Sequence, residues 1–210
     1  MPWSLSKYGR YKRCPAQYDY KYNKNIADPA GAAAQRGTNI HAQIEGFLKT
    51  GEWTANISAY AKKMAEKARS EEFIPEVRIA LDEQWKPVDW KDPSAWVRGV
   101  IDGVKVSADY VTMAEWKSGK IWDDHPLQRN LYLIFGLSVY SAPSARITTV
   151  YTDLEHGIED ILNRSDLEKH RAEWKSRITP MLKDTFFSPR PGQHCAWCPF
   201  STRKGGPCSY

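Results

Sequence analysis

The segment WVRGVIDGVKVSADYVTMAEWKSGK, residues 96–120, decides the fold that we predict for this chain. It contains two runs, 96–106 and 110–117, whose residue pattern predicts two strands. The short connection between them indicates a hairpin that turns about the Ala108–Asp109 bond. The segment therefore predicts two antiparallel strands at the centre of the fold.

This hairpin gathers three charged side chains at one place. Side chains alternate across a strand, so Glu115 and Lys117 share one face, while Trp116 points to the other. With a loop of even length Asp102 faces Glu115 directly, whereas an odd loop would place Asp102 beside Ala114 or Trp116. Two neighbouring carboxylates repel each other unless a cation lies between them. Asp102 and Glu115 are therefore candidate ligands of Mg²⁺ or Mn²⁺, which suit oxygen-rich, partly hydrated sites.

Such a site has the chemistry of phosphodiester hydrolysis. A divalent ion polarises a phosphodiester and acidifies a bound water into a nucleophile. Lys117 beside it would orient that water and stabilise the negative charge that develops in the transition state. The alternative is a solvated strand face on which Glu115 and Lys117 only pair, because the spacing of one acidic residue and one lysine is common.

Helical and strand patterns alternate outside the hairpin. Helices are expected after Ser4, after the turn-prone Asp28-Pro29-Ala30-Gly31, from Ile57 to Ala68, after Pro126 and from a capping box at Ser165–Glu168, and strands at 76–81 and 146–151. This order predicts an α/β or α+β fold, with a small mixed β-sheet flanked by helices. A length of 210 residues is that of one ordinary domain, so we expect a single domain over residues 1–210.

Composition and charge allow a polyanionic partner. The hydrophobic fraction of 41% and the charged fraction of 26% are those of a globular protein. A net charge of +5, nine Trp and eleven Tyr permit nucleic-acid binding without proving it. We expect no membrane segment, because no apolar run reaches spanning or signal-peptide length, and a cytoplasmic location, or the host cytoplasm if a phage encodes the protein. The chain lacks the phosphate-binding loop of a helicase, so any motor must be a partner.

Four cysteines lie near the two ends of the chain. Cys195 and Cys198 form a CxxC pair that can present two thiolates to one metal, and Cys208 and Cys14 can complete a tetrahedral site or a cubane. In a reducing cytosol, metal ligands or unconnected thiols are more expected than disulfides. A shared metal would fasten the Pro-, Gly- and Cys-rich tail, residues 188–210, to the N-terminal region.

Several short motifs follow one another in a fixed order. They are Ser4-Leu-Ser6 with Arg13-Cys14-Pro15, Gly37-Thr-Asn-Ile-His41, Glu76, Gly99 to Asp102, Glu115-Trp-Lys117-Ser-Gly119, and Gln128-Arg-Asn-Leu-Tyr132. In this order they resemble the PD-(D/E)xK nuclease superfamily, specifically its RecB-like exonuclease branch. That branch includes the CRISPR-associated spacer-acquisition nuclease, AddB-type nucleases and phage exonucleases. The resemblance covers almost the whole chain; Glu76 alone is equally explained as a surface charge paired with Arg78.

The resemblance implies a restriction-endonuclease-like core around a site for Mg²⁺ or Mn²⁺. Asp102 and Glu115 would ligate the ion, and Lys117 would be the catalytic lysine. The Trp116 carbonyl would add a ligand, and His41 would complete or support the site. The remaining pair, Gln128 and Tyr132, lies one helical turn apart and would contact the DNA backbone or the surroundings of the nucleophile.

Iron–sulfur members of the branch also have one N-terminal cysteine and three near the C-terminus. This similarity implies a four-iron four-sulfur cluster held by Cys14, Cys195, Cys198 and Cys208. The nine-residue gap before Cys208 departs from the shorter gap that is common in those nucleases. Zinc therefore stays open as the alternative metal.

The function that the resemblance implies is a metal-dependent DNA exonuclease. It would prefer single-stranded DNA ends and serve recombination, repair or DNA processing, with a helicase or recombination partner. Aromatic and basic residues of the N-terminal helix are expected to form a wall that grips phosphates and stacks unpaired bases; they are Tyr8, Arg10, Tyr11 and Arg13. A non-cleaving, metal-stapled nucleic-acid-binding module and a site-specific endonuclease on the same fold stay open as alternatives.

Overall fold

A computed structural model describes residues 2–28, 31–55 and 57–210 of the chain. Two compact units account for most of them. The sheet unit is built mainly from Gly31–Glu173, and the terminal unit from Trp3–Ala30 together with Trp174–Tyr210. Pro29 and Ala30 of the predicted turn lie outside the described residues. None of the helices in the described ranges combines the length and apolar character that crossing a membrane requires.

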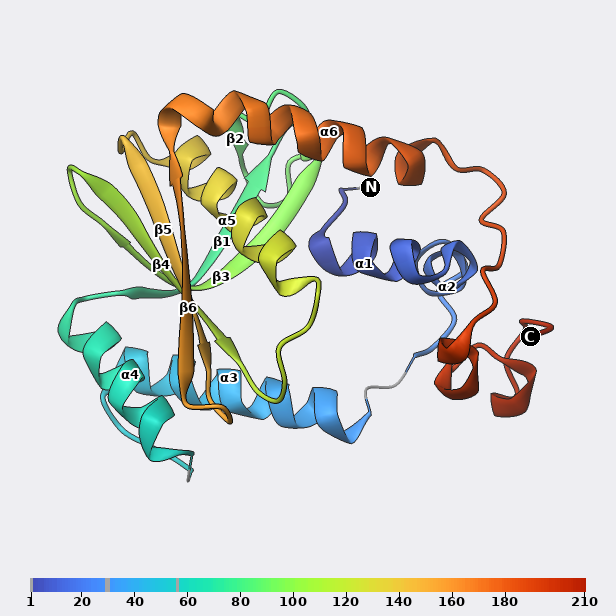
Figure 1. Cartoon of the computed structure of the whole chain (residues 1–210), viewed down its shortest axis with the longest axis horizontal. Coiled ribbons are helices and arrows are strands. Elements are labelled where there is room, and N and C mark those ends of the chain that lie inside the picture. Colours follow the sequence, from blue (N-terminus) through green and yellow to red (C-terminus); the bar gives the residue numbers. More distant parts are fainter. Residues whose placement is uncertain (1, 29–30, 56) are drawn as a thin grey trace. The chain divides into compact units, whose positions relative to one another are not determined.

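The sheet unit contains a six-stranded mixed sheet (Figure 1). Its strands are β1 (Ile74–Leu81), β2 (Pro87–Val88), β3 (Val97–Val106), β4 (Tyr110–Lys117), β5 (Ser144–Tyr151) and β6 (His156–Asn163), in the spatial order β2-β1-β3-β4-β5-β6. β4 and β5 run parallel, and the other neighbouring pairs are antiparallel. The predicted mixed sheet is confirmed. The sequence pattern did not indicate β2 and β6, because β2 has two residues and the side chains of edge strand β6 are mostly exposed.

The central hairpin has the predicted register. Gly103 pairs with Ala114 and Val106 pairs with Val111, so the turn has an even loop centred on the Ala108–Asp109 bond. Extending this register by one residue sets Asp102 opposite Glu115, as predicted. A local periodicity of two, combined with a short loop, therefore brought the two carboxylates together without any long-range information.

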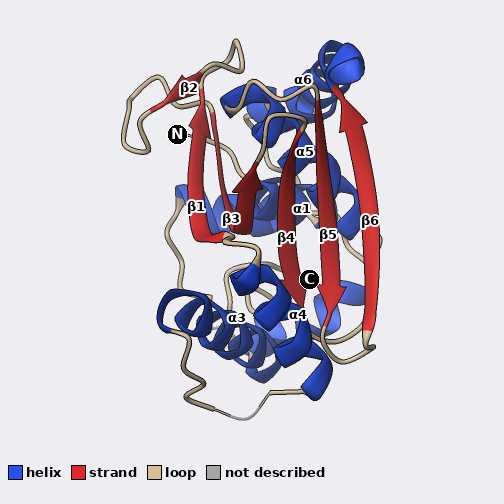
Figure 2. Ribbon diagram, turned by 90° about the vertical axis from the view of Figure 1, so that its left-hand side faces the viewer, coloured by secondary structure: helices blue, strands red, loops and turns tan. Residues whose placement is uncertain are grey.

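Helices cover both faces of the sheet (Figure 2). On one face, α3 (Ala32–Thr50) and α4 (Ala59–Ser70) share a buried apolar cluster with Ala114 and Trp116 of β4 and with Val150 of β5. On the other face, α5 (His125–Val139) approaches β4 so closely that a Cβ at Gly136 would lie 3.0 Å from a Met113 side-chain carbon. Glu115 and Trp116 point to opposite faces of β4, as predicted, and Glu115 is on the face that α5 covers.

Gly99 allows α5 to pack against β3. A Cβ at Gly99 would lie 2.4 Å from a ring carbon of Phe135 and 3.3 Å from one of Tyr132. We therefore expect Gly99→Ala to lower the free energy of unfolding by about 1–3 kcal/mol, measured by urea denaturation. Gly46→Ala is the matched control, because no atom lies within 4 Å of its Cβ inside α3. It should raise stability by about 0.5–1 kcal/mol; equal stability of the two variants would contradict the packing role of Gly99.

The terminal unit begins with α1 (Leu5–Arg13), which Ser4 caps by accepting a hydrogen bond from the Lys7 N–H at 3.4 Å. The chain continues through α2 (Pro15–Tyr18) and a π-helical turn (Asp19–Asn23). Helix α6 (Leu167–Lys183) begins after a 3-10 turn at Arg164–Asp166, slightly later than the predicted capping box, and its second half belongs to this unit. The tail contains two further 3-10 turns, Gln193–Trp197 and Thr202–Lys204.

The stacking wall predicted on α1 is wrong at Tyr8. Tyr8 is buried, and the edge of its ring packs on Trp174 with centroids 5.8 Å apart. The Tyr11 hydroxyl donates to Asp184 at 2.8 Å, and Arg10 forms an ion pair of 2.6 Å with Asp28. These contacts all lie within the terminal unit, and the burial of Tyr8 removes its ring as a stacking surface for a nucleic acid. Arg13, the fourth residue of the predicted wall, is exposed.

Candidate active site

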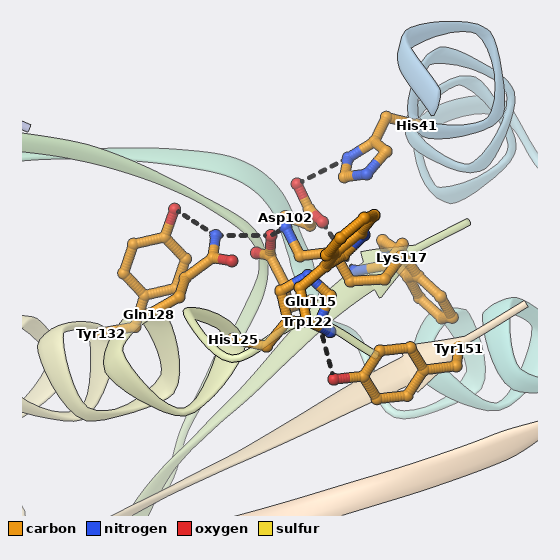
Figure 3. A network of polar contacts seen from close by, with 10 residues as sticks. His41, Asp102, Glu115, Lys117, Trp122, His125, Gln128, Tyr132 and Tyr151 are labelled. Carbon is orange, nitrogen blue, oxygen red and sulfur yellow. Dashed lines mark hydrogen bonds and ion pairs between the residues drawn. The ribbon is translucent and has the colours of Figure 1, made fainter. Parts of the chain in front are cut away.

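Four elements of the sheet unit deliver the predicted site residues to one place (Figure 3). His41 comes from α3, Asp102 from β3, Glu115 and Lys117 from β4, and Gln128 and Tyr132 from α5. Hydrogen bonds connect them in two groups, one around each carboxylate. Residues spread over ninety positions of the sequence thus meet at the end of the β3–β4 ladder.

Glu115 lies at the centre of the larger group. Its Oε1 accepts hydrogen bonds from Lys117 Nζ at 2.7 Å and from Gln128 Nε2 at 2.8 Å. Its Oε2 is buried and has no hydrogen-bond partner among the described residues. An unpartnered buried carboxylate oxygen is costly unless a cation or a water contacts it. Glu115 Oε2 is therefore suited to bind a divalent ion that prefers oxygen ligands, such as Mg²⁺.

Asp102 is held from two sides. Its Oδ1 lies 3.1 Å from His41 Nδ1, and its Oδ2 accepts a hydrogen bond of 2.8 Å from the Trp116 backbone N–H. The carboxylate is thereby fixed where the β3–β4 ladder ends. Trp116 contributes a backbone donor here, while its side chain is buried on the opposite face. Its carbonyl as a metal ligand stays a prediction.

Burial and neighbouring charges shift the pKa values of the ionisable side chains at this site. Burial, followed by the charge of Asp102, raises the pKa of Glu115 to about 7. Burial alone would lower the pKa of Lys117, but the charge and hydrogen bond of Glu115, with Asp102, raise it above its usual value. Burial also opposes protonation of His41, yet its hydrogen bond to Asp102 raises the pKa of this imidazole. Lys117 is therefore a stable cation beside a carboxylate that loses its proton only near neutral pH.

Gln128 and Tyr132 lie on one side of α5, as the spacing predicted. Gln128 Nε2 also donates to Tyr132 Oη at 3.1 Å, so the amide bridges the tyrosine and Glu115. Burial and the charge of Glu115 raise the pKa of Tyr132 well above its usual value, so this phenol stays protonated. Tyr132 is buried, and the pair acts as a neutral hydrogen-bonding support for the Glu115 carboxylate.

Glu76 lies near Asp102. Burial, then the charges of Asp102 and Glu45, raise the pKa of Glu76. Its backbone has a φ of 54°, a left-handed conformation that is unfavourable for this residue type. Arg78, the partner expected for a mere surface charge, instead lies over the Trp90 ring at 5.8 Å. The position of Glu76 favours the motif interpretation over the surface-charge interpretation.

A second set of contacts fixes the end of β4, and no sequence pattern predicted it. The Arg36 guanidinium donates to both carboxylate oxygens of Asp153, at 2.7 and 2.8 Å. The same carboxylate accepts the Gly119 N–H at 2.8 Å, and the Thr152 N–H donates to the Lys117 carbonyl at 2.8 Å. These bonds fasten the segment that carries Lys117 to α3 and to the residues after β5.

His125 and Tyr151 form a buried pair beside Lys117 that sequence reasoning also missed. His125 Nδ1 lies 2.9 Å from Tyr151 Oη, and the Trp122 N–H donates to the same nitrogen at 3.4 Å. Burial and the Lys117 charge lower the pKa of His125, so its imidazole is neutral near pH 7. A histidine at the start of a helix has no chemical signature in a sequence, because its role depends on a partner 26 positions away.

The raised pKa of Glu115 predicts that the metal-free protein becomes less stable as pH rises. Folding raises this pKa from 4.5 to about 7, so the folded state holds a proton that the unfolded state releases in that range. At about 1.4 kcal/mol per pKa unit, the loss across this range is at most about 3 kcal/mol. Urea denaturation in EDTA at pH 5 and pH 8 measures it. Glu115→Gln should reduce the loss and Asp109→Asn, an exposed turn residue, should not; identical pH dependence in all three proteins would contradict the assignment.

The four cysteines belong to the terminal unit and line one small cavity of it, together with Tyr20 and Phe200. Backbone amides already point at two of the sulfurs. Arg190 N–H donates to Cys14 Sγ at 3.3 Å, and Gly192 N–H donates to Cys195 Sγ at 3.4 Å. Such amide contacts suit thiolate ligands. The four cysteines thus line the same cavity, and their binding of a common metal stays a prediction.

Neither the carboxylate site of the sheet unit nor the cysteine cavity of the terminal unit shows a complete set of metal ligands among the described residues. Throughout residues 2–28, 31–55 and 57–210, no three His, Cys, Asp or Glu side chains converge so as to hold an ion. In the sheet unit His41 contacts Asp102 by a hydrogen bond and so supports this carboxylate. In the terminal unit the structure does not support the predicted four-iron four-sulfur cluster.

The solved structures that resemble this chain include one that shares its fold. A comparison with curated protein sequences finds no match. The crystal structure of SSO0001 superposes with a TM-score of 0.52 at 17% identity, covering 99% of this chain and 86% of that one, which shows a shared fold. An alkaline exonuclease (LHK-Exo) from Laribacter hongkongensis gives a TM-score of 0.40 at 12% identity, with 86% of each chain covered. Its complex with dAMP gives 0.42 at 14%, with 85% of each chain covered.

The comparison with protein families covers nearly the whole chain. The family model described as the PD-(D/E)XK nuclease superfamily matches residues 2–203. The matched range includes the hairpin with Asp102, Glu115 and Lys117, as well as His41, Gln128 and Tyr132. The chain therefore belongs to the PD-(D/E)XK nuclease superfamily.

Proposed function

We propose that this nuclease is a Mg²⁺- or Mn²⁺-dependent DNA exonuclease that hydrolyses phosphodiester bonds from single-stranded ends. The observation that carries the metal dependence is the buried, unpartnered Oε2 of Glu115 beside Asp102, with Lys117 bonded to the same carboxylate. A nucleic-acid-binding module that does not cleave would have no use for this arrangement, because it would leave a buried oxygen unsatisfied without any gain.

Each residue of the site has a defined task in this proposal. Asp102 and Glu115 would hold the ion, which supplies Lewis-acid activation of the phosphodiester and of a bound water. Lys117, kept charged by Glu115, would orient the attacking water and stabilise the charge of the transition state. His41 and the Trp116 N–H fix the direction of the Asp102 carboxylate. Gln128 does the same for Glu115.

The DNA substrate and the need for a free end rest on the sequence motifs. The Gln128-to-Tyr132 motif is typical of the end-processing branch that the chain resembles, and a net charge of +5 suits a polyanionic substrate. The sequence has no nucleotide-driven motor motif, so we infer that a helicase or recombination partner opens duplex DNA where this is required. The proposed setting is the cytoplasm of the cell, or of the host if a phage encodes the protein.

Defined DNA strands test the proposal. End-labelled linear and covalently closed circular single strands are incubated with Mn²⁺ and, separately, with EDTA. We expect progressive loss of the linear strand with Mn²⁺, no loss in EDTA, intact circles, and activity that falls steeply as salt rises. Rapid cutting of circles would favour the site-specific or general endonuclease alternative. Binding without cleavage under every metal condition would favour the non-cleaving module.

We further infer that Cys14, Cys195, Cys198 and Cys208 bind one metal centre that fastens the tail. Their shared cavity and the amide contacts to Cys14 and Cys195 support this inference. A four-iron four-sulfur cluster and a zinc ion are the two candidates, and both would be structural because the site belongs to the terminal unit.

Colour and metal content distinguish these two candidates. An iron–sulfur cluster makes freshly purified protein brown, with iron and sulfide in equal amounts, whereas a zinc site gives colourless protein with one zinc per chain. In both cases Cys195→Ala should release the metal and make residues 188–210 sensitive to proteolysis, because the tail loses its cross-link. Ser188→Ala, in the same tail, is the control. Protein that carries neither metal, with unchanged proteolysis in Cys195→Ala, would show that the thiols are unconnected.

A further inference from the structure

The loop from Ser118 to Asp124 directly follows β4, the strand that carries Lys117, and exposes two large apolar side chains to solvent. Ile121 is 46% exposed and Trp122 is 54% exposed. The loop starts at the residue after Lys117 and ends where α5, the helix of Gln128, begins. Single exposed apolar residues are common, so exposure by itself assigns nothing. The way in which the loop is held gives the second observation.

The loop backbone is attached to the buried pair of His125 and Tyr151 (Figure 3). The Trp122 N–H donates to His125 Nδ1 at 3.4 Å, and the same nitrogen lies 2.9 Å from the Tyr151 hydroxyl. The two rings also stack, with centroids 5.5 Å apart. Because the backbone of Trp122 is held by this bond, its exposed indole stands on a supported base, and less backbone entropy is lost when a ligand contacts it.

A cation lies against the exposed indole. The ammonium of Lys120 is 4.1 Å from the centroid of the Trp122 ring, within the range of a cation–π contact. An aromatic face next to an ammonium matches the two parts of a nucleotide, because the base stacks on the ring and the phosphate pairs with the cation. Lys117, three residues earlier than Lys120, carries a second positive charge on the same stretch of chain.

From this geometry we propose that Trp122, supported by Lys120, is a stacking subsite for one unpaired base next to the scissile phosphate. The inference rests on the proposed nuclease function, because that function places the phosphate at Asp102, Glu115 and Lys117. Inside a duplex both faces of a base are covered by the neighbouring base pairs, whereas a flexible single strand can turn one base out to the indole, so the subsite favours single strands. The subsite supplies the single-strand preference that the buried Tyr8 of α1 cannot supply.

Binding of DNA strands with single missing bases tests the subsite. The strands carry one abasic position, moved stepwise from the end, and the affinity is measured by fluorescence anisotropy in the Glu115→Gln variant, which prevents cleavage. We expect one position at which the missing base weakens binding about tenfold, in the range of one stacked base. Adding Trp122→Ala should abolish the difference between intact and abasic strands at that position, while Trp122→Phe should retain part of it.

Trp197→Ala is the matched control, because Trp197 is 67% exposed and belongs to the terminal unit. It should leave the abasic effect unchanged. The inference is overturned if no abasic position matters, if strands do not bind, or if the effect persists in Trp122→Ala.

Cleavage by the protein with Glu115 intact is measured separately. An abasic effect that depends on Trp122, in a protein that never cleaves, would retain the stacking subsite and refute the nuclease proposal. Cleavage without any abasic effect would retain the nuclease proposal and refute the stacking subsite.

Discussion

Asp102→Asn and Glu115→Gln are each expected to abolish nearly all hydrolysis, by about 1,000-fold or more. Both replacements remove a negative oxygen at the proposed ion site, which costs several kcal/mol of transition-state stabilisation. The amides preserve size and acceptor capacity, so Asn at position 102 can still accept the Trp116 N–H. Cleavage of end-labelled single strands in Mn²⁺ measures the effect.

Two controls separate chemistry from folding in this experiment. Asp109→Asn changes an exposed carboxylate in the turn of the same hairpin and should retain full activity. Urea denaturation should show that both active-site variants are folded. Activity within a few-fold of the wild type in either Asp102→Asn or Glu115→Gln would refute the assignment of that carboxylate.

Lys117→Ala is expected to lower hydrolysis by about 100- to 1,000-fold while the protein still binds Mn²⁺. The lysine ammonium donates to Glu115 Oε1 and is not itself a ligand, so its loss removes stabilisation of charge in the transition state. Calorimetric titration with Mn²⁺ measures binding, and cleavage measures catalysis.

The pH of this titration matters, because Lys117 lowers the pKa of Glu115 and its removal will raise it further. Titration of both proteins at several pH values above 7 therefore separates the effect of Glu115 protonation on Mn²⁺ binding from the effect of losing the lysine. Lys105→Ala, on β3, is the matched control for loss of one lysine from the hairpin. Joint loss of Mn²⁺ binding and activity in Lys117→Ala at high pH would show that the lysine maintains the site's structure instead of assisting the reaction.

The sequence alone determined the hairpin, its register and the identity of the carboxylate–lysine group. These features depend on residues close together in the chain. Side chains alternate between the two faces of a strand, and the short loop sets which residues of the two strands lie opposite each other. Amphipathic spacing likewise identified α3, α4 and α5 with their buried residues. The exposed edge strand β6 carries no such alternation and was not predicted.

The tertiary structure alone decided how the site is supported and which aromatic residues are free. His41 meets Asp102 across 61 positions, and Arg36 meets Asp153 across 117, so no local pattern encodes either contact. Tyr8 and Trp122 are both aromatic residues near basic ones in the sequence. Packing buries the first against Trp174, while hydrogen bonding fixes only the backbone of the second and leaves its ring in solvent. Composition cannot distinguish them, because exposure depends on what the rest of the folded chain places beside each ring.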